Sequence, residues 1–117
     1  MQRQPRQRDE KHIRFIQGLP CIVCNDNTST EAAHVRFADP RALKRYVGKA
    51  EKPDDKWTVP LCGKCHRTQH TMNEQDFWAS VGINPLMVSL ALYSVTGDHA
   101  AGEELVYAQM PVSTRQR

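Results

Sequence analysis

The chain lacks any long apolar run. Its 117 residues contain no stretch of about 18 apolar side chains, so we expect no membrane-spanning helix. Residues 1–11 are polar and basic, unlike the apolar centre of a secretory signal peptide, so we expect no such signal and a reducing, cytoplasmic location. Aromatic side chains number only eight. A core this thin predicts that a metal ion or disulfides contribute to stability.

Charge of one sign is not in large excess, but it is unevenly distributed. The net charge is +3. Residues 1–50 carry ten Lys and Arg against five Asp and Glu, whereas residues 51–117 carry six against eight. A basic first half is typical of proteins that contact phosphates, and also of a solvated basic face with no ligand.

Turn and capping signals predict a single domain with both helices and short strands. We expect a disordered basic tail over 1–8, the domain over 9–110 and a frayed C-terminus over 111–117. Strands are predicted over 30–37 and 57–61. Helices are predicted over 9–17, 41–47, 66–70, 71–81, 85–95 and 99–110, with Thr71 and Glu74 as a capping box and Gly82 as a stop.

Four cysteines occur as two Cys-x-x-Cys pairs, Cys21 with Cys24 and Cys62 with Cys65. A two-residue gap lets both thiolates of a pair bind one ion, and two pairs complete the tetrahedron that Zn²⁺ prefers. In a reducing compartment such pairs are more often metal ligands than disulfides. With His66, the second pair also matches the c-type haem attachment pattern, but haem would leave the first pair unexplained. We therefore predict a structural zinc site.

Two histidines, His66 and His70, follow the second cysteine pair. Because they are four residues apart, they would share one face of a helix, as a metal-chelating pair does. A surface pair without a ligand, or a histidine that replaces a cysteine on zinc, is the alternative. His34 lies between the cysteine pairs, where zinc would hold it against this helix, although a lone histidine beside small apolar residues is usually a core residue. His12 and His99 receive no role.

These features together resemble the HNH (ββα-metal) nucleases. The resemblance covers residues 11–80 and implies an α+β fold, with a small zinc-stapled ββα-metal core and additional flanking helices. The run Lys-Pro-Asp-Asp-Lys-Trp-Thr-Val-Pro-Leu-Cys is similar to the recombination-enhancement (Ref-type) nucleases of phages and prophages. The matching residues occur in the order Cys21-x-x-Cys24, Ala-Ala-His34 and Val-Pro-Leu-Cys62-x-x-Cys65-His66-x-x-x-His70.

The resemblance implies a metal-dependent endonuclease that hydrolyses DNA phosphodiester bonds in phage recombination or DNA processing. His34 matches the general base, and His66 and His70 match the positions that hold a divalent ion, Mg²⁺ or Mn²⁺. An unperturbed histidine has a pKa of about 6.5, which suits a base that works near neutral pH. The resemblance also suggests a recombinase filament on DNA as a partner, in the cytoplasm of a bacterium or phage-infected host.

The sequence departs from the pattern of these nucleases at three places. Many relatives carry Asp or His as a further metal ligand directly before the base, where this chain has Ala33. The middle position of the signature, often Asn, has no clear match, and Asp55 is the first candidate for it, with Asp54 next. The connection over 38–56 is charged rather than glycine-rich and has no assigned place in the site.

Basic residues of the tail and the connection are the candidates for contacts with DNA phosphates. Such contacts fix position without reading sequence, so we expect little sequence specificity and weaker binding as salt rises. A basic segment that only aids solubility is the alternative for both regions. The candidates are Arg3, Arg6, Arg8 and Lys11 in the tail, and Arg36, Arg41, Lys44, Arg45 and Lys49 in the connection.

Two further functions stay open at the level of sequence. A non-catalytic, zinc-stapled module that binds nucleic acid would explain the cysteines and the basic half, and Ala33 favours it. A zinc-stabilised adaptor for a replication or recombination protein would dock through the apolar segment over 86–95, which more often simply completes a core. The oligomeric state, the form of the DNA and the identity of the catalytic metal do not follow from the sequence.

Overall fold

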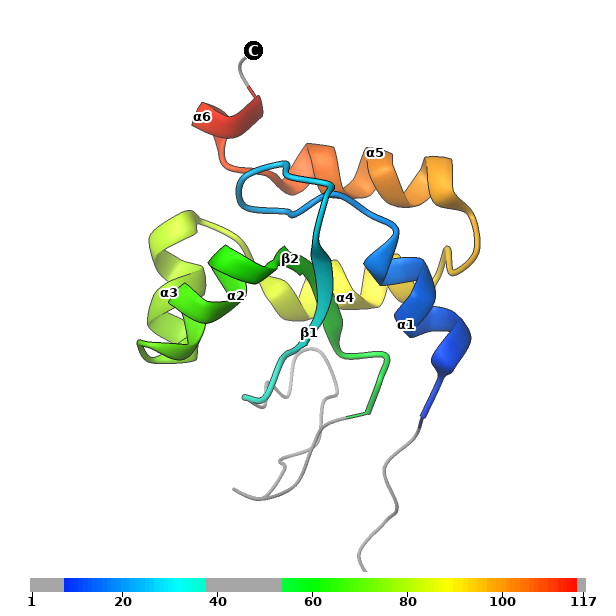
Figure 1. The fold of residues 1–117 in the computed structure, drawn as a ribbon, viewed down its shortest axis with the longest axis horizontal. Helices are drawn as coiled ribbons and strands as arrows, with labels where there is room; N and C mark the ends of the chain where they lie inside the picture. The colour runs from blue at the N-terminus through cyan, green and yellow to red at the C-terminus, as the bar shows by residue number, and fades with distance from the viewer. Residues whose placement is uncertain (1–7, 38–53, 116–117) are drawn as a thin grey trace, which may run out of the picture.

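The structure of the protein, a computed structural model, describes residues 8–37 and 54–115. In this part of the chain, a two-stranded antiparallel sheet and six helices form a small α+β fold, as the sequence predicts (Figure 1). None of the described helices is long and apolar enough to cross a membrane. The elements are α1 (Glu10–Gln17), β1 (Thr30–His34), β2 (Thr58–Cys62), α2 (Gly63–His70), α3 (Glu74–Val81), α4 (Pro85–Tyr93), α5 (His99–Gln109) and α6 (Val112–Arg115).

Several predictions fall on residues outside the described ranges. They are most of the basic tail and of the connection, together with the predicted helix over 41–47. The candidate DNA contacts in these segments are Arg3, Arg6, Arg41, Lys44, Arg45 and Lys49.

Strand β2 lies at the centre of the fold, and all five of its residues are buried. It pairs with β1 so that Thr30 lies opposite Cys62 and His34 opposite Thr58. On the other edge of β2, the Ile22 N–H donates to the Pro60 carbonyl at 3.0 Å. Helices α1, α2 and α4 also contact this strand, as Figure 1 shows around the centre of the view. The central strand therefore ties the first cysteine pair, the sheet and three helices together.

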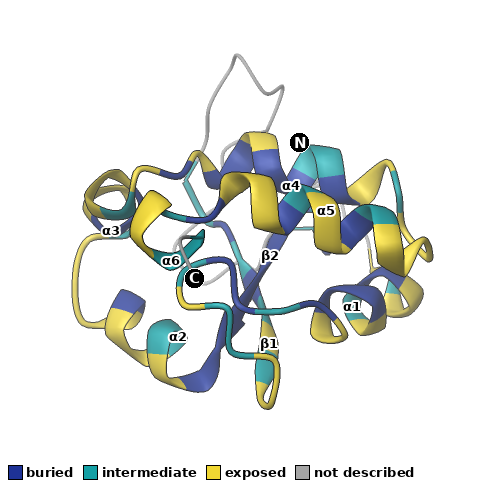
Figure 2. Ribbon diagram, turned by 90° about the horizontal axis from the view of Figure 1, so that it is seen from above, coloured by how far each residue is buried: buried dark blue, intermediate teal, exposed yellow. Residues whose placement is uncertain are grey.

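Helix α1 begins where the sequence predicts, because Asp9 is its N-cap. The Asp9 carboxylate accepts the backbone N–H of His12 at 3.1 Å. One face of the helix, with His12, Phe15 and Ile16, is buried, whereas most of its other residues are exposed (Figure 2). A cap and an apolar stripe are thus enough to define this element from sequence.

Helix α2 begins at Gly63, inside the second cysteine pair, and not after it as predicted. The Cys62 side chain is its N-cap and accepts the Cys65 backbone N–H at 3.4 Å. A thiolate or thiol sulfur thus takes the capping place that Ser, Thr, Asp or Asn usually fills. As a result, the strand passes directly into the helix, and Cys65 and His66 lie in its first turns.

The predicted capping box at Thr71 and Glu74 is wrong. Asn73 caps α3 instead, since its side chain accepts the Asp76 N–H at 3.1 Å. Thr71 belongs to the end of α2, where its hydroxyl donates to the Thr68 carbonyl at 2.7 Å. The stop at Gly82 is confirmed: this residue has a φ of 71°, the left-handed conformation that glycine adopts without strain.

The C-terminal helices α4 and α5 contribute buried residues to the core. Helix α4 has its N-cap at Asn84 and Pro85 in its first turn, as predicted. Helix α5 packs so closely on α1 that a Cβ at Gly102 would lie 2.7 Å from the Phe15 ring. In the segment expected to fray, residues 112–115 form one turn, and the Thr114 hydroxyl donates to the Val23 carbonyl at 2.7 Å.

Candidate functional site

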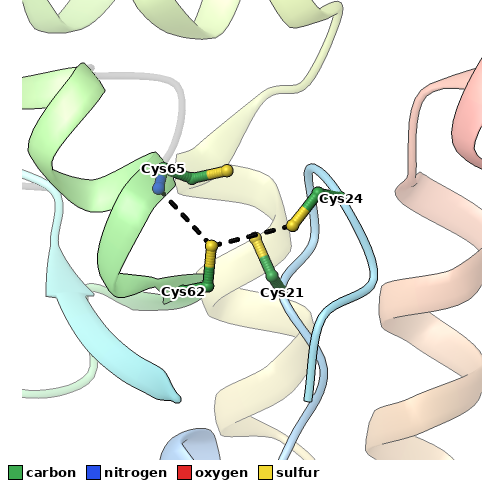
Figure 3. A group of neighbouring side chains, drawn as sticks. All are labelled: Cys21, Cys24, Cys62 and Cys65. Atoms are coloured by element: carbon green, nitrogen blue, oxygen red, sulfur yellow. Dashed lines mark hydrogen bonds between the residues drawn. The ribbon is translucent and has the colours of Figure 1, made fainter. Parts of the chain in front are cut away.

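The four cysteines converge on one point between the first loop, β2 and α2. Their sulfur atoms all lie within 4.8 Å of one another, and the sulfurs of Cys24 and Cys62 are 3.6 Å apart (Figure 3). With Zn–S bonds of about 2.3 Å, two sulfurs of a tetrahedral zinc site lie about 3.8 Å apart. All four are free thiols rather than disulfides. The thiol cluster, Cys21, Cys24, Cys62 and Cys65, could therefore hold a zinc ion.

Local backbone geometry explains how the first pair reaches this point. After Cys21 the chain reverses, since the Asn25 N–H donates to the Cys21 carbonyl and the Cys21 N–H donates to the Asp26 carbonyl, both at 2.8 Å. Asn25 has a φ of 68°, a conformation that asparagine tolerates better than most residues. The turn residues after the first pair are thus what fold it into a knuckle.

Crowding shifts the pKa values of the clustered thiols apart. Burial, reinforced by Cys21 and Cys62, raises the pKa of Cys24 to about 11, and burial with the same kind of crowding raises the pKa of Cys65 further. For Cys62 burial acts upwards too, but hydrogen bonds from Cys65, Cys24 and Cys21 together lower its pKa. Metal ions bind thiolates, so a bound cation would favour loss of the protons of these thiols.

His34 and Asp55 form a second polar feature, at the end of the hairpin away from α2's first turn. The His34 Nε2 atom lies 3.0 Å from Oδ1 of the buried Asp55. The other carboxylate oxygen, Oδ2, accepts the Asp9 backbone N–H at 2.7 Å. Asp55 is therefore held from two sides, and the His34 side chain remains 23% exposed. Asp54, the second sequence candidate, lines a separate depression. 

That depression, of about 190 Å³, is lined by cationic, acidic and aromatic side chains, two of which flank Asp55 in the chain. Of the predicted phosphate contacts, it includes Arg8. Lys11 is exposed on α1, and Arg36 is half-buried, with its backbone N–H donating to the Glu74 carboxylate. The lining residues are Arg8, Asp9, Asp54, Lys56 and Tyr93.

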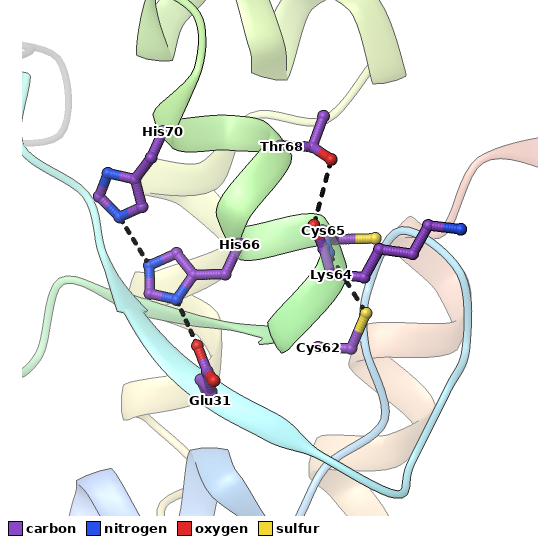
Figure 4. Close-up of polar contacts among 7 residues, drawn as sticks. All are labelled: Glu31, Cys62, Lys64, Cys65, His66, Thr68 and His70. Carbon is purple, nitrogen blue, oxygen red and sulfur yellow. Dashed lines mark hydrogen bonds and ion pairs between the residues drawn. The ribbon is translucent and has the colours of Figure 1, made fainter.

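The third feature is a chain of contacts that we call the histidine relay: Glu31, His66 and His70. The Nε2 atoms of His66 and His70 are 3.2 Å apart, and the rings share one side of α2. On its other nitrogen, His66 Nδ1 lies 2.7 Å from the Glu31 carboxylate on β1 (Figure 4). Among residues 8–37 and 54–115, however, the thiol cluster is the one group of three or more ligand atoms within 4.8 Å of one another.

Sequence reasoning missed Glu31 and the part that Asp9 plays beside Asp55. The sequence did contain a signal for Glu31. Side chains two residues apart on a strand share a face, so Glu31 lies on the same face of the strand as Ala33, the position at which the sequence analysis noted a missing ligand. Ala33 is 3% exposed and offers no ligand atom. For Asp9 there was no such signal, since its backbone contact with Asp55 joins residues 46 apart in the chain.

Comparison with known families gives one result. The family model described as "Protein of unknown function (DUF968)" matches residues 2–96, which is most of the chain. The protein therefore belongs to the DUF968 family. Neither the comparison with curated proteins nor the comparison with solved structures gave a match.

Proposed function

We propose that this member of the DUF968 family is a metal-dependent endonuclease that hydrolyses DNA phosphodiester bonds. The observation that supports it most directly is that one unit, the β1–β2 hairpin with the helix α2 that follows it, carries two pairs of polar side chains in contact. This unit carries the pair of His34 and Asp55 on the hairpin side and the pair of His66 and His70 on the helix. Hairpin followed by helix is also the order of the ββα-metal core that the sequence resembles.

In this proposal His34 is the general base. The Asp55 carboxylate can only accept a hydrogen bond when ionised, so it favours the tautomer of His34 with its proton on Nε2. The Nδ1 atom would then take the proton from the attacking water. The charge of Asp55 stabilises the imidazolium that results, much as a carboxylate orients the base in other hydrolases.

His66 and His70 would hold the divalent ion, Mg²⁺ or Mn²⁺. Two nitrogens bound about 2.1 Å from one ion lie roughly 3.0–3.4 Å apart when the angle between them is about 90–109°, and the 3.2 Å between these Nε2 atoms fits that range. When bound, such an ion stabilises the negative charge that develops on the leaving oxygen. No other step is assigned to it.

The thiol cluster would hold a structural zinc ion. It joins the loop after α1 and the end of β2 to the start of α2, the helix that carries His66 and His70. Structural zinc contributes on the order of 10 kcal/mol to folding in small domains, which would compensate for the few aromatic residues. The disulfide and haem alternatives gain no support from four free thiols that converge on one point.

DNA would be bound through its phosphates, by Arg8, Lys11, Arg36 and the basic residues outside the described ranges. Contacts of this kind give little sequence specificity and weaken steeply with salt. From the resemblance to the Ref-type nucleases, we further propose a cytoplasmic role in phage recombination or DNA processing, with a recombinase filament on DNA as an activating partner.

One observation favours a second function, a non-catalytic zinc-stapled module that binds nucleic acid. The strand position directly before His34 holds buried Ala33 in place of a ligand. The three residues of the histidine relay form a line of contacts, from Glu31 to His66 and from His66 to His70, and do not surround one point. Such a module would bind DNA with the same salt dependence but would not cut it.

Nicking of supercoiled plasmid by zinc-loaded protein, with and without added Mg²⁺ or Mn²⁺, tests the two functions against each other. The nuclease predicts nicking that needs the added ion and falls about 10²–10⁴-fold in His34→Ala, the range expected for loss of a general base. The matched control is His99→Ala, since His99 is an exposed histidine on α5 whose partner is Glu103. That variant should nick as the parent does.

Three outcomes would count against the nuclease. Equal nicking by His34→Ala and the parent would remove the role of His34, and nicking without an added ion would remove the role of the histidine pair. If the parent binds plasmid but does not nick it, also in the presence of a recombinase filament, the binding module is the better explanation.

A further inference from the structure

We propose that Glu31 is the positioning residue of the histidine pair on α2: its carboxylate binds the Nδ1 proton of His66 and so turns the Nε2 lone pair of His66 towards His70. This inference rests on the proposed function, because it assigns a supporting residue to the proposed divalent-ion site. It adds a residue to which neither the sequence analysis nor the resemblance assigned a role.

The position of the proton in this hydrogen bond supports this role. An ionised carboxylate has acceptor atoms only, so the hydrogen bond of 2.7 Å between His66 and Glu31 requires the proton on Nδ1 of His66. A neutral imidazole with its proton on Nδ1 carries its lone pair on Nε2. That atom is the one that faces His70 Nε2 at 3.2 Å. Metal-bound histidines commonly donate their second N–H to a carboxylate in this way.

The position of Glu31 on β1 explains why the carboxylate comes from this residue. Alternation along the strand places Glu31 on the same face as Ala33. Figure 4 shows Glu31 reaching from β1 to His66 on α2, with His70 beyond it. Because Ala33 has no polar group, Glu31 supplies the acidic side chain of this face of β1 next to the histidine pair.

The exposure of the contact separates a positioning role from a structural one. The Glu31 side chain is 52% exposed and that of His66 22% exposed. An ion pair or hydrogen bond so open to water adds little to the stability of a fold. Loss of the Glu31 carboxylate should therefore change how the histidine pair binds a cation while the stability of the protein stays nearly the same.

A similar pair elsewhere in the chain provides the matched control. His99 and Glu103 on α5 form an exposed histidine–carboxylate contact of 3.3 Å, with side chains 56% and 54% exposed. Since they lie in a helix that carries none of the proposed site residues, Glu103→Ala removes an equivalent carboxylate without touching the histidine relay.

The experiment is a titration of the full, zinc-saturated chain with Mn²⁺, followed by the electron paramagnetic resonance signal of free Mn²⁺. The parent should bind one further Mn²⁺ that His66→Ala fails to bind. Glu31→Ala should bind it about 10–100-fold more weakly, the usual cost of losing such a supporting partner. Glu31→Gln keeps an acceptor oxygen and should lose less, and Glu103→Ala should bind as the parent does. Thermal unfolding of the zinc-loaded variants should coincide with that of the parent.

The outcomes separate this inference from the proposed function. If Glu31→Ala binds Mn²⁺ as tightly as the parent, the positioning role is overturned and the nuclease proposal stands. If the parent binds no Mn²⁺ beyond its zinc, the divalent-ion site itself fails, and the inference fails with it. A nitrogen-15 spectrum that shows the His66 proton on Nε2 in the parent would also overturn the role of Glu31.

Discussion

Two neighbouring residues on α2, Cys65 and His66, belong to clusters of different construction. The four sulfurs of the thiol cluster lie around one point, and Cys21 and Cys62 are almost fully buried. The histidine relay is instead a line of two contacts at a partly open surface. Atoms that converge on one point specify the ligand that belongs there, whereas a line of contacts specifies only how each ring is oriented. The geometry of the thiol cluster alone thus indicates that it could hold a zinc ion, whereas a metal site at the relay needs a functional hypothesis.

The largest expected difference follows from this comparison: substitution of Cys65 should disrupt the fold, while substitution of His66 should not. Cys65→Ser removes a ligand of the proposed zinc site, and structural zinc contributes on the order of 10 kcal/mol to folding in small domains. His66→Ala changes a residue outside that site, so the free energy of unfolding should change by only about 0.5 kcal/mol, as at other surface positions.

Urea denaturation followed by circular dichroism, together with the zinc content of each purified variant, measures this difference. The parent treated with a chelator serves as the reference for complete loss of the ion. Equal destabilisation by Cys65→Ser and His66→Ala would mean that the two clusters are one structural unit, and the division of α2 into a structural and a functional side would be wrong.

The Asp55 side chain has both a structural contact and a contact with a proposed catalytic residue. Its substitution should have the next largest effect. Its Oδ2 atom supports the start of α1 through Asp9, and its Oδ1 atom contacts His34. Asp55→Asn keeps the shape but removes the charge, so we expect a loss of about 1.5–3 kcal/mol in unfolding free energy. Plasmid nicking should fall about 10–100-fold, less than in His34→Ala, because the base remains but is poorly oriented.

Chemical denaturation and nicking, both measured at a temperature where the variant is fully folded, separate these two contributions. Asp76→Asn is the control, since Asp76 is an exposed carboxylate in the first turn of α3. A folded Asp55→Asn protein with full nicking activity would show that Asp55 supports α1 only.

Local signals in the sequence account for most of the helices. A cap and a stop residue lie within four positions of the groups that they satisfy, and so Asp9, Gly82 and Asn84 mark helix ends correctly. Where two polar residues compete for the same task, as Thr71 and Asn73 do before α3, the sequence does not decide, because the end of the preceding helix determines which one is available.

Contacts between distant segments account for what the sequence could not predict in the candidate site. The spacing of the cysteines was sufficient to predict their cluster, since each pair is local and zinc geometry supplies the rest. Glu31 meets His66 only because β1 packs against α2, and Asp9 meets Asp55 only because α1 packs against the hairpin. Periodicity can place a side chain on a face, but packing decides which residue it meets there.

The last comparison is between buried His12 and the partly exposed histidines of the relay, and substitution of His12 should have the smallest effect. It is fully buried, and its Nδ1 atom lies 2.8 Å from the Thr96 hydroxyl oxygen, which itself donates to the Tyr93 carbonyl. His12 therefore donates from Nδ1, and its Nε2 atom has no hydrogen-bond partner. Burial lowers the pKa of His12, although the charges of Asp9 and Asp55 partly oppose this shift.

A lowered pKa in the folded state means that the unfolded chain binds more protons at this residue. The contribution of neutral His12 to stability is thus fully present above its unfolded pKa of about 6.5, and it is lost as the pH falls from there towards the folded pKa.

His12→Asn keeps a donor near the Thr96 hydroxyl but cannot titrate. It should be less stable at pH 8, by about 1–3 kcal/mol for the lost ring, yet lose less stability than the parent below pH 6.5. Urea unfolding of both zinc-saturated proteins across this range measures the difference, in which the common pH dependence of the zinc site cancels. Parallel curves would mean that the pKa of His12 is the same in the folded and the unfolded protein, and burial would then not be what distinguishes His12 from the exposed relay.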